Sequence, residues 1–357
     1  MIDILDPARD RDRIDALLHA GDHRLVDAWA TARPELTALA QFTGEEVPDS
    51  AQLDSWSRYV VYPWRRTVVR VPVDPLLHRL RTARNRFLIT DDEQAAWSSA
   101  QLAVAGLSVG ASVVQVAALT GARRFHLADP DTLGPTNLNR LAGSVCDLGL
   151  AKTTLAARRL LEADPYAEIA TWDQGYRVDR SAEFLRGRDG RPVDVVIEEM
   201  DDLAMKVAVR SHVRTARIPL IMVTDDGDNV ILDVERHDLD RDYPPFHGAA
   251  GEIAEYDLEA LRDPANRVRA AGAIVGPDVA PRVAEALAHV GQTIPSWPQL
   301  GTAASLAGVV GAFAARTIVC GGDLPSGRYR VAIDDALTAH TAHTAHTGHT
   351  GPAHAAA

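Results

Sequence analysis

The sequence predicts an α/β protein with a Rossmann-like, doubly wound, mostly parallel sheet and an N-terminal extension of helices and strands. Two observations lead to this fold class. First, the apolar run Leu102–Ala105 enters Gly106, a helical pattern follows, and a second apolar run, Phe125–Ala128, ends in Asp129. Second, strands and helices go on alternating after this unit, which favours a parallel sheet with helices on both faces.

The extension precedes this unit. Residues 1–55 carry apolar side chains at three- and four-residue spacing, which predicts amphipathic helices. Ser55–Val71 is β-branched and aromatic, which predicts a strand pair or an extended cover. Its arginines either face solvent or reach an anion: Arg65, Arg66 and Arg70. A further helix is predicted to start at Thr90, because three acids occupy its first turn.

The elements after the unit continue the alternation. They are a helix that ends before Pro165, a strand around Ile169, a strand at Val193–Glu199, a helix from Leu203 to about Thr215 and a strand at Ile218–Val223. Beyond Asp233 the pattern is weaker. It predicts a proline-punctuated loop at 241–252, interrupted helices in 253–290, a helix rich in small residues within 296–322 and an edge strand at 327–334.

These patterns divide the chain into four parts. Residues 1–80 are predicted to form the extension, residues 81–235 the Rossmann-like domain, and residues 236–337 a C-terminal part of that domain that supports the substrate or a dimer. Residues 338–357 are a His-, Thr- and Ala-rich tail that is too poor in apolar bulk to pack, so we expect disorder there. Its histidines form a flexible spacer or bind nickel or zinc weakly.

Composition narrows the function classes. The chain has 357 residues, 46% of them hydrophobic, which is enough to bury a sizeable core. Its formal net charge of −12 repels nucleic acid, so we expect no nucleic-acid partner. The two cysteines imply no disulfide framework and no four-cysteine zinc site. We see no export signal and no apolar run of 18 residues, and therefore expect a cytoplasmic protein without a membrane partner.

The first strand–turn–helix unit is typical of a nucleotide site. Its turn, with Gly106, Ser108 and Gly110, lets backbone N–H groups and a helix N-terminus face phosphate. Asp129 closes the second strand, where an acid can bond ribose hydroxyls. Because ATP and other nucleotides are anionic and the chain is acidic, such a ligand has to meet cations placed locally.

The polar segment Ala128–Arg140, ADPDTLGPTNLNR, resembles the ThiF/MoeB/HesA family, the bacterial relatives of ubiquitin-activating enzymes. Further features match the family in order: Gln94 upstream of the first strand, Lys152 at the family's spacing, the stretch VDVVIEEMDDLAMK and the stretch IPLI. The resemblance covers about residues 80–235. It implies a Rossmann-like fold and the adenylation of a carboxylate with ATP and Mg²⁺.

The resemblance also implies roles for single residues. Asp129 would bond the ribose, Lys152 would stabilise the α-phosphate region, and Asp201 would hold magnesium. Asn137 and Arg140 would contact phosphates, and either Arg84 or Arg86 would reach the active site of the other subunit of a homodimer. The predicted nucleotide-binding set also includes Gly106, Ser108, Gly110 and Asp131. The carboxylate belongs to a small molecule, a peptide or the C-terminus of a ubiquitin-like carrier protein.

Each of these residues also has a purely structural interpretation. Asp129 can cap a loop, Asn137 and Arg140 can be ordinary loop residues, and Lys152 can be a solvated helix lysine. Asp201 or Asp202 can N-cap the helix that begins near Leu203.

The sequence departs from the family pattern in several places. The glycine turn GLSVGAS lacks the central glycine, Glu198 stands where the family usually has Asp, and the CxxC pairs that bind zinc in many members are absent, so we expect no structural zinc. Cys146 is either a small buried apolar residue or an acyl acceptor, and Cys320 is less suited to catalysis. His247 is a structural loop residue, binds substrate or acts as an acid or base.

Three functions remain open from the sequence. The leading one is an adenylyltransferase that makes an acyl-adenylate and passes the acyl group to a nucleophile. The second is a nucleotide-binding interaction protein or pseudoenzyme, which the altered glycine turn favours. The third is an NAD-dependent oxidoreductase, because a glycine turn followed by an acid also fits that class.

Overall fold

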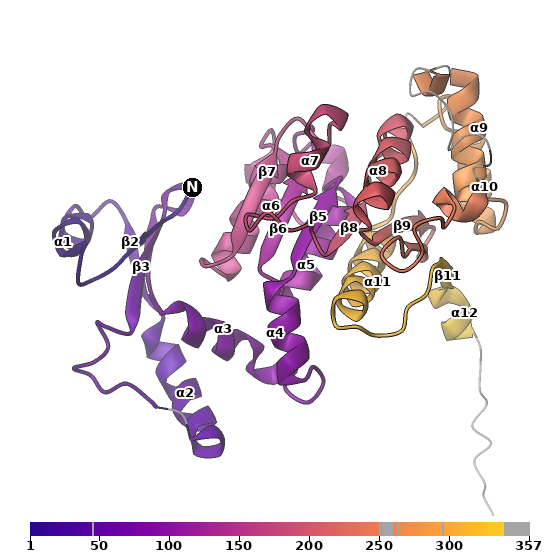
Figure 1. The fold of residues 1–357 in the computed structure, drawn as a ribbon. Coiled ribbons are helices and arrows are strands. Elements are labelled where there is room, and N and C mark those ends of the chain that lie inside the picture. The colour runs from indigo at the N-terminus through magenta and orange to yellow at the C-terminus, as the bar shows by residue number, and fades with distance from the viewer. Residues whose placement is uncertain (45, 250, 252–259, 263, 295, 339–357) are drawn as a thin grey trace, which may run out of the picture.

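The structure is a computed structural model that describes residues 1–44, 46–249, 251, 260–262, 264–294 and 296–338. Its strands form one sheet of seven and one sheet of four. The larger sheet lies in the middle of the molecule between helices, and the smaller one belongs to the N-terminal extension (Figure 1). This arrangement confirms the predicted α/β, doubly wound class with an extension.

The seven-stranded sheet has the order β11-β10-β9-β8-β5-β6-β7. Strands β5 to β9 pair in parallel, and β10 and β11 extend the sheet in antiparallel fashion. The bounds are β5 (Gln101–Ala105), β6 (Arg124–Ala128), β7 (Glu168–Trp172), β8 (Val195–Glu198), β9 (Leu220–Asp226), β10 (Asn229–Glu235) and β11 (Gly327–Val331). The edge strand β11 was predicted, whereas β10, which returns after the two-residue turn Gly227–Asp228, was not.

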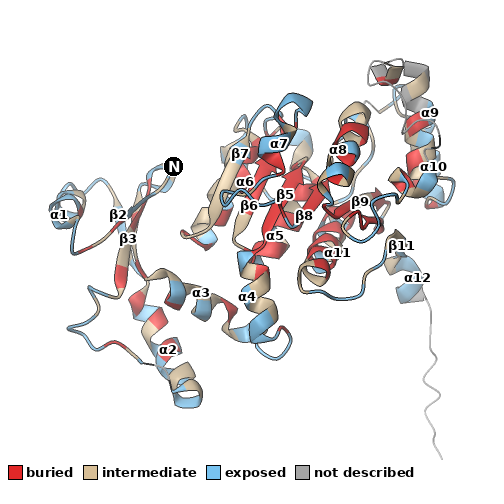
Figure 2. Ribbon diagram, in the orientation of Figure 1, coloured by how far each residue is buried: buried red, intermediate tan, exposed pale blue. Residues whose placement is uncertain are grey.

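Helices cover both faces of this sheet. One face carries α4 (Asp91–Ser99), α5 (Val109–Leu119), α6 (Lys152–Ala163) and α11 (Gly301–Val319), and the other carries α7 (Ser181–Phe184) and α8 (Leu203–Ala216). Successive strand residues point to opposite faces, so Val104 packs with α5 and α11 while Ala105 packs on the α8 side. Figure 2 shows the buried residues concentrated in these strands and the helix faces against them.

The extension combines strands with helices. Its sheet has the order β1-β3-β4-β2, and its elements are β1 (Asp3–Leu5), α1 (Arg11–His19), β2 (Arg24–Asp27), α2 (Trp29–Thr43), β3 (Ser57–Tyr62), β4 (Thr67–Pro72) and α3 (Asp74–Thr82). The predicted strand pair is confirmed. The prediction that residues 1–55 are helical is wrong at β1 and β2, because pairing with β3 and β4 decides the conformation of such short segments.

The extension is attached to the C-terminal end of α6. The Tyr62 hydroxyl donates to the Leu161 carbonyl at 2.9 Å, and Arg81 donates to Asp164 at 2.8 Å. Arg65 pairs with Glu162 at 2.7 Å, so it serves this contact instead of facing only solvent. Thr90 and Glu93 form a capping box at the start of α4, which confirms the predicted helix start.

The C-terminal part contributes α9 (Pro264–Val275), α10 (Pro281–Leu287), α11, β11 and α12 (Ile333–Thr338). The 3₁₀ helices are η1 (Pro63–Arg65), η2 (Ala83–Asn85), η3 (Pro135–Asn137), η4 (Val145–Asp147), η5 (Val178–Arg180), η6 (Pro245–Gly248) and η8 (Ala260–Arg262). The tail predicted to be disordered lies, apart from Thr338, outside the described residues.

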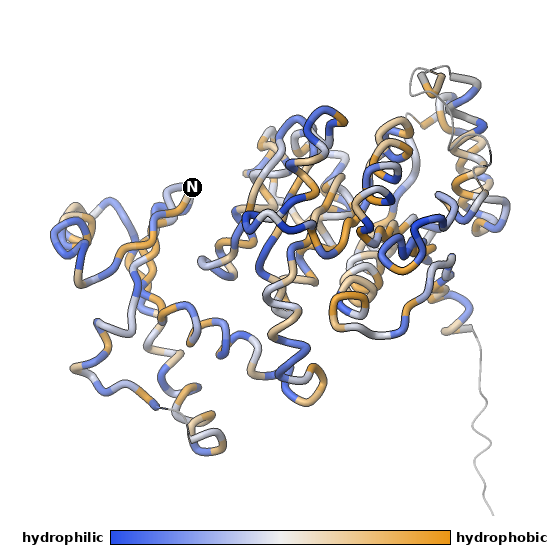
Figure 3. The backbone as a smooth tube through the Cα atoms, in the orientation of Figure 1, coloured by the Kyte–Doolittle hydropathy of each residue, from blue (hydrophilic) through white to orange (hydrophobic). Residues whose placement is uncertain are grey.

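Helix α11 is the one helix of the described chain that is long and apolar enough to cross a membrane by length and composition. The expectation of no such apolar stretch is therefore wrong. Half of this apolar stretch is buried, and a Cβ at Gly308 would lie 2.8 Å from the Ser112 carbonyl oxygen of α5. Such close packing is that of a core helix, and Figure 3 shows its apolar character beside the central strands.

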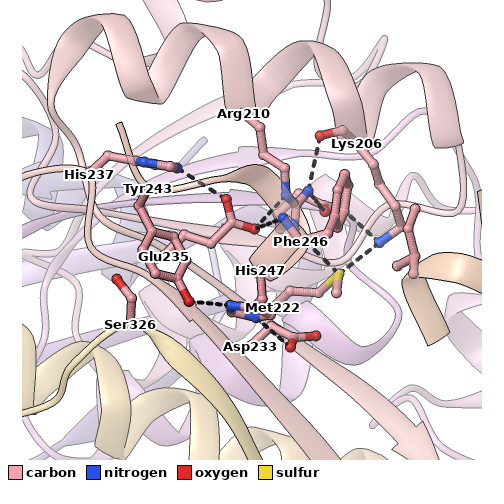
Figure 4. Close-up of polar contacts among 12 residues, drawn as sticks. Lys206, Arg210, Met222, Asp233, Glu235, His237, Tyr243, Phe246, His247 and Ser326 are labelled. Carbon is pink, nitrogen blue, oxygen red and sulfur yellow. Dashed lines mark hydrogen bonds and ion pairs between the residues drawn. The ribbon is translucent and has the colours of Figure 1, made fainter. Parts of the chain in front are cut away.

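A buried ion-pair network lies beneath α8 (Figure 4). Arg210 donates to Glu198 of β8 and to Glu235 of β10, both at 2.7 Å, and its guanidinium lies 3.7 Å from the centre of the Phe246 ring. Lys206 donates to the second oxygen of Glu198 at 3.0 Å. The network therefore connects α8 to two strands that are not adjacent in the sheet.

Candidate active site

The predicted nucleotide site lies at the carboxyl ends of the parallel strands. After β5 the chain continues through α5 to β6 on one side, whereas β8 pairs with β5 on the other side. The strand order therefore reverses next to β5, and ligands of doubly wound sheets bind in the crevice at such a point. The loops after β5, β6, β8 and β9 carry the polar groups described below.

The turn after β5 requires glycine at its first position. Gly106 has a φ of 93°, and a Cβ there would lie 2.2 Å from the Glu199 carbonyl oxygen. Gly110 is in α5, and a Cβ there would lie 2.9 Å from the Val104 side chain. Both glycines are thus explained by packing of the chain on itself, which brings the N-terminus of α5 to the strand ends.

Ser108 is the N-cap residue of α5, but its side chain makes no capping hydrogen bond. Its hydroxyl instead accepts from Arg140 Nε at 3.0 Å. Arg140 also donates to the Thr136 carbonyl and to Asn139 Oδ1, both at 3.0 Å. This arrangement places a guanidinium against a helix N-terminus, and both favour anions.

Asp129 organises the turn from the end of β6. Its carboxylate accepts from the backbone N–H of Leu107 at 2.6 Å and from that of Asp131 at 2.8 Å. Burial raises the pKa of Asp129, although these bonds and Lys152 oppose the rise. The contacts of Asp129 are therefore those of a residue that caps a loop. The remaining lone pairs of its carboxylate can still accept from a ribose hydroxyl.

Lys152, the first residue of α6, is buried rather than solvated. Its ammonium lies 2.8 Å from Asp131 and 3.7 Å from Asp129. Asn137 has a local role, because its side-chain oxygen accepts from the Gly134 N–H at 2.9 Å and closes the turn at η3. These contacts hold the segment between β6 and α6 in place beside the glycine turn.

The two acids before α8 have different tasks. Asp202 is the N-cap, and its carboxylate accepts from Ala204 at 2.9 Å and from Met205 at 3.2 Å. Asp201 is exposed, and its charge acts on Arg140. The structure thus assigns the cap to Asp202 and leaves the Asp201 carboxylate facing solvent at the site.

Two more acids lie at the strand ends and were not predicted from the sequence to be site residues. Glu199 accepts from the Val223 N–H at 2.8 Å, and burial raises its pKa well above the ordinary value. Asp225, in β9, is only 6% exposed and accepts from Gln299 at 3.0 Å through Oδ2, whereas Oδ1 has no hydrogen-bond partner. Burial raises the pKa of Asp225 to about 6. The only sign of Glu199 and Asp225 in the sequence was that each belongs to a pair of neighbouring acids at the end of an apolar strand.

Other predicted residues lie elsewhere. Arg84 is in η2, and Arg86 lies 3.8 Å from Asp91 and stacks near Phe87. His247 is bonded to Asp233 and Tyr243, both at 2.8 Å, in the loop next to the network beneath α8. Cys146 is exposed in η4, so the expectation of a buried apolar residue is wrong there. Cys320 is half-buried and its thiol contacts the Glu93 carbonyl.

The donor set fits a nucleotide with its cation. Among the described residues no group of three or more His, Cys, Asp or Glu side chains is arranged to hold a metal ion. Magnesium in nucleotide sites is usually held by one or two carboxylates and by substrate phosphates, so Asp201 and Asp225 are sufficient in number and chemistry. When bound, Mg²⁺ neutralises phosphate charge.

Comparison with known proteins identifies relatives of this region. The model of the ThiF family matches residues 82–227. An uncharacterized protein of Mycobacterium tuberculosis is 36% identical over 291 residues, which are 81% of this chain and 40% of that protein. The tRNA threonylcarbamoyladenosine dehydratase of Escherichia coli is 26% identical over 136 residues, which are 38% of this chain and 49% of the enzyme. The chain thus spans half or less of the length of these two relatives.

Solved structures with a similar arrangement include PaaA and E. coli MccB. PaaA is 15% identical with a TM-score of 0.49, and the match covers 84% of this chain and 88% of PaaA. MccB with ATP is 14% identical with a TM-score of 0.47, and the match covers 72% of this chain and 68% of MccB.

Proposed function

Since residues 82–227 belong to the ThiF family, we propose that this chain is an ATP-dependent adenylyltransferase that activates a carboxylate. The observation that carries the proposal is the contact between Arg140 and Ser108 at the N-terminus of α5, beside the carboxyl ends of β5 and β6. It gathers a guanidinium and helix N–H groups where the polyphosphate of a nucleotide has to lie.

In the proposed reaction a substrate carboxylate oxygen attacks the α-phosphorus of ATP. A bond forms between that oxygen and phosphorus, the bond from the α-phosphorus to the bridging oxygen of the β-phosphate breaks, and pyrophosphate leaves with the bonding electrons. Arg140 and the N-terminus of α5 stabilise the charge that develops on the phosphates. Asp129 keeps the glycine turn in shape and offers its remaining lone pairs to the ribose.

The finer features remain proposals as well. Asp201 would hold the Mg²⁺ that accompanies ATP. A homodimer would allow Arg84 or Arg86 to reach the site of the other subunit, and exposed Phe87 and Leu88 next to them offer apolar contact area. The substrate would be a small molecule, a peptide or a carrier-protein C-terminus, and the setting would be the cytoplasm.

A pyrophosphate-exchange assay with a panel of carboxylates and peptide C-termini tests the function. The Arg140→Ala variant should exchange about a hundredfold more slowly, because it removes a charge-assisted donor from the phosphates. Arg177→Ala removes an exposed arginine that pairs with Asp179 and serves as the control. Exchange and ATP affinity equal to the parent in Arg140→Ala would reject the site.

One observation favours a second candidate, a nucleotide-binding protein without acyl transfer. The ammonium of Lys152 is already paired with Asp131 and Asp129, so its charge is partly neutralised before any nucleotide binds. Calorimetric binding of ATP without pyrophosphate exchange on any carboxylate of the panel would support this candidate over the enzyme.

A further inference from the structure

Asp225 is a buried acid at the end of β9 that the family resemblance does not assign. The charges of Arg140 and Asp201 act on Asp225, and the charge of Asp225 acts on Glu199. Its Oδ2 accepts from Gln299, whereas its Oδ1 is buried without a hydrogen-bond partner. Buried polar atoms in native proteins are satisfied in the great majority, so a lone carboxylate oxygen calls for a ligand.

The charges around Asp225 indicate which kind of ligand its free oxygen would bind. Around the crevice, the charges of Asp225 and Asp201 act on Arg140, while Lys152 is paired with acids of its own. A polyphosphate placed beside two carboxylates is repelled by both of them. The repulsion becomes attraction only when a divalent cation lies between the phosphates and the carboxylates.

We propose that Asp225 is, with Asp201, a second carboxylate ligand for the divalent cation that accompanies the nucleotide. The two acids come from the ends of neighbouring strands, Asp201 from the loop after β8 and Asp225 from β9. Gln299, whose carbonyl accepts from Asn139 at 2.8 Å, holds Asp225 to the segment before α11. The cation takes the place of the missing donor on Oδ1.

The inference rests on the proposed function, because it assumes a nucleotide in this crevice. It has a direct consequence for binding with and without metal. With Mg²⁺, Asp225 strengthens nucleotide binding through the cation. In EDTA the same carboxylate only repels the phosphates, so its removal should improve the binding of a metal-free nucleotide.

The experiment measures by calorimetry how tightly the full chain binds a non-hydrolysable ATP analogue, once with Mg²⁺ and once with EDTA. For Asp225→Asn, affinity with Mg²⁺ should fall about tenfold or more, while affinity in EDTA should stay equal or rise. A residue that only supports the fold would weaken both. Asp228→Asn removes the same charge three residues away, where the carboxylate accepts from Thr302, and should change neither.

Two further variants keep the result decisive. Asp201→Asn changes an exposed residue that does not cap α8 and should show the same opposite changes. If both acids bind one cation, the double variant should lose little more than the larger single loss. Equal Mg²⁺ dependence in the parent and Asp225→Asn would overturn this inference alone. A parent that binds no nucleotide in either condition would overturn the proposed function instead.

Discussion

Glu198 and Glu199 are neighbours in sequence, the first fully buried and the second half-buried, yet they belong to two different regions of the molecule. Glu198 lies in the network beneath α8, where Lys206 and Arg210 hold its pKa below the ordinary value. Glu199 faces the strand ends, where burial raises its pKa well above that value. The network contains acids whose charge is satisfied within the fold, and the crevice contains acids whose charge is not.

Other residues follow the same division. In the network, Arg210 holds the pKa of Glu235 down to about 2. Next to the network, His247 and Arg328 lower the pKa of Asp233. In the crevice, burial raises the pKa of Asp225 to about 6. A paired buried charge fixes the fold, whereas an unpaired one destabilises it until a ligand arrives. The comparison therefore separates residues that maintain the structure from residues that serve binding.

The largest effect is expected when the network loses its central cation. Arg210→Ala leaves Glu235 buried without its main partner and Glu198 with Lys206 alone, which should lower the free energy of unfolding by about 3–5 kcal/mol. Urea denaturation measures it, with Arg177→Ala as an exposed control within about 0.5 kcal/mol. A loss below about 1 kcal/mol for Arg210→Ala would mean that the network does not hold the fold.

The crevice should respond in the opposite direction. Asp225→Asn keeps the shape of the side chain but removes a buried, incompletely paired charge, so at pH 7 without nucleotide it should raise the free energy of unfolding by about 1 kcal/mol. Urea denaturation in the absence and presence of nucleotide checks the sign. A variant that is less stable than the parent without ligand would show that Asp225 supports the fold.

Acid should act on the two regions with opposite signs. The folded pKa of Glu235, about 2, lies below its ordinary 4.5, so its stabilising contribution is complete above pH 4.5 and is lost as the pH falls towards 2. The folded pKa of Asp225, about 6, lies above its ordinary 3.8, so its cost is present above pH 6 and disappears as the pH falls towards 4. The gain from Asp225→Asn should therefore vanish between pH 7 and pH 4 in urea titrations, while the loss from Glu235→Gln persists to pH 4.5.

The smallest effects concern Asp201 and Asp202, a second pair of neighbouring acids. Asp202→Ala removes the N-cap of α8 and should cost about 1 kcal/mol of stability, whereas Asp202→Asn retains capping and should cost little. Asp201→Ala should change the free energy of unfolding by less than about 0.5 kcal/mol in urea denaturation, because the residue is exposed. If Asp201→Ala and Asp202→Ala lost equal stability, Asp202 could not be distinguished from Asp201 as the residue that caps α8.

The sequence by itself determined the α/β class, most of the strands and helices of the nucleotide-binding domain and the order of the ThiF family motifs. These depend on local properties: apolar runs such as Leu102–Ala105, the first-turn acids after Thr90, and residue spacing from Asp129 to Lys152. Period and composition report such features directly, since they arise between residues close in sequence.

Only the tertiary structure decided which acids are paired. Arg210 lies twelve residues from Glu198 and twenty-five from Glu235, and Asp225 meets Gln299 across seventy-four residues. The short strands β1 and β2 likewise depend on partners distant in sequence, β3 and β4. The charge state of a buried acid follows from desolvation and from the nearest opposite charge, and both are set by the packing of the whole chain.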